Sequence, residues 1–170
     1  KVTNLDKLTA MLEVSEKLPE ERLDELMSAV DALPTADKLT LEDAETVENL
    51  YTLYSQMADK TLVENGDVLE AAYAKIQQLR GEDTAAKLVA DIAALPAVDK
   101  LTLADEGTVS GLEYRLENLA EEYAELVTNA DLLKSARVRL TEIQSKLDAL
   151  DILLTTKLNG AITLESKGLI

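Results

Sequence analysis

Apolar residues recur at alternating spacings of three and four along most of this chain, which is the pattern of one buried face of an α-helix. Two such runs are Val47, Leu50, Tyr54 and Met57, and then Val109, Leu112, Leu116, Leu119, Tyr123 and Leu126. No segment of comparable length alternates apolar and polar residues as a half-buried strand would. The pattern therefore predicts an all-α protein.

Further runs with the same spacing flank each of these two helices. The preceding helices are predicted from Leu23, Leu26, Val30 and Leu33, and from Ala85, Leu88, Ile92 and Leu95. The following helices are predicted from Leu69, Ala72, Ile76 and Leu79, and from Leu133, Ala136, Leu140, Ile143, Leu147 and Leu150. Three amphipathic stripes of this length can close a small bundle around one apolar core.

The chain also repeats itself. Residues 33–43 return as residues 95–105, an offset of 62 residues, and after a gain of two residues the Val-x-Asn-x-Asp-x-Leu signature at 63–69 returns at 127–133. A repeat of this length is typical of a tandem array of small helical units. The same signature opens the chain at Val2, and Ile162-Thr163-Leu164-Glu165 resembles the Leu-Thr-Leu box starting again.

We therefore predict tandem three-helix bundles that form an elongated array. Residues 1–18 are assigned to the last helix of a preceding repeat, 19–80 to a first complete module, 81–143 to a second module, and 144–170 to the start of a following repeat. Residues 141–154 contain neither Gly nor Pro, so the third helix of one module and the first helix of the next are either separate or continuous.

Local signals place the helix ends. Pro34 and Pro96 are expected to end the first helices, because proline cannot continue the hydrogen-bond ladder. Thr40 precedes Asp43 by three residues, and Thr102 precedes Asp105 in the same way, which is close to a capping box.

Two further residue types mark the third helices. Asn65 and Asn129 are candidate side-chain caps at their starts. Gly81 is expected to end the third helix of the first module, with Asp83 capping the next helix.

These caps and core positions resemble the three-helix repeats of large secreted and cell-surface proteins of Gram-positive bacteria, in the style of FIVAR-like and S-layer-associated helical modules. The resemblance extends from Val2 to Glu165, and the chain departs from it where Lys157 replaces the proline of the crossing loop. It implies an extracellular location at the cell surface or cell wall. The matching positions concern fold rather than chemistry, so the resemblance implies no ligand.

Composition narrows the classes of function. The formal net charge is −16, with 33 acidic against 17 basic residues, which argues against binding to nucleic acid. There is neither Cys nor His, so thiolate nucleophiles, Ser-His-Asp triads and Cys- or His-ligated zinc sites cannot be built from these residues. No apolar run approaches the roughly 20 residues of a transmembrane helix, so no membrane insertion is expected.

The remaining candidate chemistry has simpler explanations. Acidic pairs such as Glu121-Glu122 are more economically read as solvated helix faces than as the paired carboxylates of a glycosidase. The turn at 64–67 has oxygen ligands but lacks the spacing of a calcium loop, so helix capping is favoured over a metal site. We predict no enzyme activity, no cofactor and no metal.

Tyrosines are the remaining candidates for binding. Tyr54 and Tyr123 fall on the apolar stripes and are expected in the core, whereas Tyr51, Tyr73 and Tyr114 are expected to be partly exposed and are the candidate protein-binding residues. The sequence favours a non-catalytic spacer or stalk whose partners are neighbouring repeats of the same chain. The alternative is an adhesive module that binds a host or cell-wall protein through its helix faces.

Overall fold

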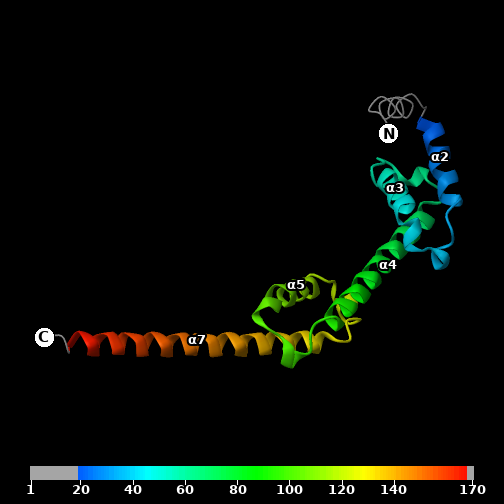
Figure 1. Cartoon of the computed structure of the whole chain (residues 1–170). Coiled ribbons are helices and arrows are strands. Elements are labelled where there is room, and N and C mark those ends of the chain that lie inside the picture. Colours follow the sequence, from blue (N-terminus) through cyan, green and yellow to red (C-terminus); the bar gives the residue numbers. More distant parts are fainter. Residues whose placement is uncertain (1–18, 168–170) are drawn as a thin grey trace, which may run out of the picture. The chain divides into compact units, whose positions relative to one another are not determined.

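The computed structural model describes residues 19–167, and the side-chain surroundings of residues 22–158. Every regular element in the described range is helical, and no strand occurs there, so the all-α prediction from hydrophobic spacing is confirmed. Contacts divide the chain into two compact units, Lys1–Arg80 and Gly81–Ile170. Figure 1 shows the helices of both units. The repeat signature predicted at the start of the chain lies outside the described residues.

Unit one contains α2 (Pro19–Asp31), α3 (Ala44–Ser55) and the first part of α4 (Gly66–Ala93). The crossing loop between α2 and α3 holds two short 3-10 turns, η1 (Ala36–Lys38) and η2 (Leu41–Asp43), and a third, η3 (Lys60–Leu62), precedes α4. Its core is formed by Leu26, Val30, Leu39, Ala44, Val47, Tyr54, Val63, Leu69, Ala72 and Ile76.

Unit two contains the rest of α4, then α5 (Glu106–Glu117), α6 (Glu121–Ala124) and α7 (Ala130–Lys167), with the turns η4 (Val98–Lys100) and η5 (Leu103–Asp105) in its crossing loop. Its core is formed by Ala85, Leu88, Ile92, Leu101, Val109, Leu112, Val127, Leu133, Ala136 and Leu140. Most of these positions match core positions of unit one at the repeat offsets. The two units therefore bury equivalent faces of equivalent segments.

The predicted capping boxes are both present. The backbone N–H of Thr40 donates to the carboxylate of Asp43 at 2.9 Å, and that of Thr102 donates to Asp105 at 2.8 Å. Both boxes open a 3-10 turn that leads directly into the second helix of the unit. The residues just before the boxes, Leu39 and Leu101, are buried. In each unit the crossing loop is therefore fixed by the hydrogen bonds of its capping box and by the burial of one leucine.

The prediction that Gly81 ends a helix is wrong, and so is the predicted cap at Asp83. Both residues lie inside α4, which continues without a break from the third helix of unit one into the first helix of unit two. Gly81 has no left-handed backbone conformation. A Cβ built on it would lie 2.3 Å from ring atoms of Tyr123, so the residue provides space for a tyrosine ring rather than a helix stop.

The second helices are shorter than their apolar runs predict. In unit two, α5 ends at Glu117 and the chain turns before α6, so Leu119 and Tyr123 lie beyond the helix. The Asn118 side chain donates to the Tyr114 carbonyl at 2.8 Å, and Ala120 has extended backbone angles. Asparagine competes in this way with the helical ladder, so the apolar spacing continues although the helix does not.

The side chains of Asn65 and Asn129 do not cap the helices that follow them. Each helix begins at the next residue, but the Oδ1 atom of both asparagines is buried and has no hydrogen-bond partner among the described residues. The Nδ2 atoms instead donate at 2.8 Å to backbone carbonyls of the first helix, those of Met27 and Val89. Each asparagine therefore ties the third helix to the first.

A third crossing loop does not form at the end of the described range. Helix α7 continues through residues 157–165 to Lys167, so the prediction that a Leu-Thr-Leu box starts again at Ile162 is wrong for the local structure. In the first two crossing loops a proline stands shortly after the helix end, at Pro34 and Pro96. Residues 157–165, Lys157 included, contain no proline, so the backbone N–H groups that a helix requires are all present.

Candidate functional site

The candidate site lies where the second and third helices of a unit face each other. In unit one, Tyr51 of α3 and Tyr73 of α4 stack with ring centroids 3.8 Å apart and ring planes 6° apart. Both side chains are half-buried and pack against the core. The structure therefore brings together two of the three tyrosines predicted for binding, and each ring covers much of the other.

Tyr54 lies next to Tyr51. Its ring is buried, as predicted, and its centroid lies 6.1 Å from that of Tyr51. Its hydroxyl donates to Glu70 Oε1 at 3.0 Å. Burial, and then the hydrogen bond and negative charge of Glu70, raise the pKa of Tyr54 above its ordinary value, because both disfavour the phenolate.

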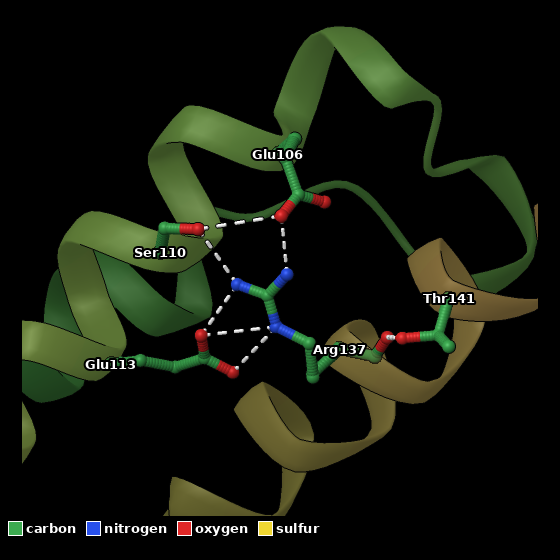
Figure 2. Close-up of polar contacts among 5 residues, drawn as sticks. All are labelled: Glu106, Ser110, Glu113, Arg137 and Thr141. Carbon is green, nitrogen blue, oxygen red and sulfur yellow. Dashed lines mark hydrogen bonds and ion pairs between the residues drawn. The ribbon is translucent and has the colours of Figure 1, made fainter. Parts of the chain in front are cut away.

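In unit two, the contact between the second and third helices is ionic at this place, as Figure 2 shows. The guanidinium of Arg137, on α7, donates from Nε to both carboxylate oxygens of Glu113, at 2.9 and 3.0 Å. Its Nη1 bonds Glu106, and its Nη2 bonds Ser110 Oγ at 2.8 Å as well as Glu113. These carboxylates raise the pKa of Arg137 above its already high ordinary value. The three α5 residues therefore hold the guanidinium in a fixed orientation.

The aromatic and the ionic pair occupy the same places in the repeat. Glu113 follows Tyr51 by the 62-residue offset of the second helix, and Arg137 follows Tyr73 by the 64-residue offset of the third. Most core residues around the two pairs are equivalent in the two units, whereas both members of the pair differ between them. A partner that recognises the tyrosine stack would therefore not find the same surface on unit two.

Tyr114 is placed apart from the other two predicted residues. It belongs to α5 in unit two and is 67% exposed, the most solvent-accessible of the three. Tyr123, expected in the core, is half-buried and lies against Gly81. The three predicted binding residues thus do not form one cluster on a single unit.

Sequence reasoning missed the Arg137 cluster. Glu106, Ser110 and Glu113 are spaced by four and three residues, so they share one face of α5. Arg137 follows the core residue Ala136 and is only 32% exposed. Alignment of the two repeats could have indicated the cluster, because it places Glu113 at the position of Tyr51 and Arg137 at the position of Tyr73.

Within residues 19–167, no group of three or more acidic side chains is arranged to hold a metal ion. Asp67, in the turn considered for calcium, accepts from the Val68 backbone N–H at 2.9 Å. The same described range contains no helix with the length and hydropathy required to cross a lipid bilayer.

Comparison with known proteins adds no relative: no family model, no curated protein and no solved structure matches this chain.

Proposed function

We propose that this chain is a non-catalytic spacer, built from three-helix bundles in tandem, within a protein of the Gram-positive bacterial surface. The observation that supports it most is the continuous helix α4. Its first part contributes Leu69 and Ile76 to one core, and its second part contributes Leu88 and Ile92 to the other. A helix shared in this way links units that each bury their own apolar residues, which is the arrangement expected of a repeat array.

The charge of the chain fits the same role. A formal net charge of −16 makes copies repel one another, and this repulsion opposes self-association of densely displayed repeats. The location at the cell surface or cell wall, with the S-layer as one setting, rests on the resemblance of the caps and core positions to secreted helical repeats. No catalytic step is assigned to any residue.

A distance measurement tests the spacer proposal. The chain has no cysteine, so Glu45→Cys on α3 and Glu117→Cys on α5 give two exposed labelling sites, one on each unit. Spin labels at these sites should give a narrow distance distribution in the natural chain. The matched control has a flexible Gly-Ser segment inserted between Arg80 and Gly81, and its distribution should be broad. Equal breadth in both chains would refute the spacer proposal.

The second candidate is adhesion, and the exposure of Tyr114 favours it. Large aromatic side chains that remain accessible are frequent anchors of protein interfaces. Binding of the full chain to serum, matrix and cell-wall fractions should then be lost in Tyr114→Ala or Tyr51→Ala. Under the spacer proposal neither substitution changes the captured material, and Glu117→Ala, next to Tyr114 on α5, serves as the control.

A further inference from the structure

The second half of α7, residues 144–158, extends beyond the other described helices of unit two (Figure 1). Its apolar side chains are exposed. Six large apolar side chains there are 48–67% exposed: Leu147, Leu150, Ile152, Leu153, Leu154 and Leu158. In contrast, Leu133 and Leu140 in the first half of the same helix are each 1% exposed. The first half of the helix thus has a buried apolar face beside the exposed Leu132 and Val138, whereas all the large apolar side chains of the second half are exposed.

These apolar residues lie on more than one side of the helix. Leu147, Leu150 and Leu154 continue the stripe of Leu140, whereas Ile152 and Leu153 lie on the other side, as roughly 100° of rotation per residue requires. The polar residues Asp148, Asp151 and Thr155, spaced by three and four, form one stripe between them, and Ser145, Lys146, Thr156 and Lys157 lie on the remaining sides. A helix with large apolar side chains on more than one side normally buries more than one side. A single partner helix would leave one of the apolar sides uncovered, so two helices are needed.

The chain itself shows what covers such a segment. Helices α4 and α7 align without a gap from Gly66 with Ala130, so Ala149, Ile152 and Leu153 take the positions of Ala85, Leu88 and Val89. In unit two, Ala85 and Leu88 are each 1% exposed, because α5 and the first half of α7 pack over them. The equivalents of these two positions in α7 are apolar but lack the covering pair, whereas Thr156 takes the position of the buried Ile92.

We infer that residues 144–158 form the first helix of a further unit, and that their partner is a helix pair of the same repeat type, a crossing loop followed by second and third helices. The local charge fits such an interface. Lys146 and Lys157 balance Asp148 and Asp151, so this segment is neutral within a chain of net charge −16. The inference rests on the proposed tandem array and names the binding face and the partner.

An extended chain supplies the inferred partner. It keeps residues 1–157 and then repeats residues 94–170. The segment 144–157 is then followed by the same crossing loop and two helices that follow α4. Because the natural chain has no cysteine, Ile152→Cys in the first copy reports burial through its rate of thiol labelling. We expect labelling to slow by roughly tenfold or more in the extended chain relative to the natural chain, because a docked residue reacts only on local opening. Leu153→Cys is the second reporter.

Two controls make the result specific. Thr155→Cys, on the polar stripe, should label at the same fast rate in both chains. Leu112→Asp placed only in the added copy should restore fast labelling of Ile152→Cys, because the residue at this position of unit two is 4% exposed in its core.

The outcomes separate the alternatives. Equal labelling of Ile152→Cys in both chains, with amides of α2 to α5 still protected from exchange, would overturn the inference and leave the proposed function standing. Slow labelling already in the natural chain, together with a dimer in sedimentation, would assign the face to a second copy and also overturn it. If the amides of α3 and α5 exchange freely in the natural chain, the two proposed bundles are not folded, and the proposed function fails as well.

Discussion

Gly81→Ala should destabilise unit two, although alanine is normally the better helix former. In a helix interior the substitution gains about 0.5–1 kcal/mol, since glycine has more backbone entropy to lose on folding. Here the added methyl would stand 2.3 Å from Cε2 and Cζ of Tyr123, so the ring must leave its site. Displacing a packed side chain costs about 1–3 kcal/mol. The net expectation is a loss of about 1 kcal/mol in the free energy of unfolding of unit two.

The same unit offers a matched control. Gly111 lies inside α5 with nothing within 4 Å of an added Cβ, so Gly111→Ala should stabilise by about 0.5–1 kcal/mol. Amide exchange of unit two in the full chain is the suitable assay, because two units need not unfold in one step. In a Tyr123→Ala background, Gly81→Ala should become stabilising. If Gly81→Ala stabilises the natural chain as much as Gly111→Ala does, the reasoning from the tyrosine contact is refuted.

Four further predictions concern single contacts. Thr102→Ala should cost about 1 kcal/mol in urea unfolding through loss of its capping box, and Thr102→Ser should recover most of it. Asn129→Asp should lower the free energy of unfolding by about 1–3 kcal/mol, because aspartate cannot donate to the Val89 carbonyl on α4. An unchanged stability would indicate that the residue acts only as a helix cap, a role that aspartate also fills. Arg137→Met should cost about 1 kcal/mol at low ionic strength and less in high salt, since two carboxylates lose their partner; a loss independent of salt would contradict this. The raised pKa of Tyr54 stabilises unit one fully below pH about 10, and this contribution should disappear as pH rises through the folded-state pKa, as alkaline unfolding of Tyr54→Phe against the natural chain would reveal.

Features that depend on neighbouring residues could be predicted from the sequence. The capping boxes at Thr40 and Thr102 involve residues three positions apart, so their geometry follows from the local chain. The core positions could be predicted because burial follows the helical period, and Val47 and Val109 are fully buried as their stripes require.

Features that depend on contacts between distant segments could not be predicted. Gly81 has the local properties of a helix end, and only the ring of Tyr123, far along the chain, explains its place inside α4. Asn129 resembles a cap in its local context but bonds a carbonyl 40 residues away. The candidate site shows the same limit: the tyrosines could be identified by composition, whereas the pairing of Tyr51 with Tyr73 required the packed helices.

The exchange of a tyrosine pair for an ion pair also has a consequence for how neighbouring repeats avoid folding into each other. Tandem units of similar sequence are prone to domain swapping and misassembly. If α5 packed against the third-helix part of unit one, Glu113 would face Tyr73, and the carboxylates of α5 would lose their guanidinium. Each second helix is thereby matched to its own third helix, and an incorrectly paired intermediate is penalised by unpaired charge.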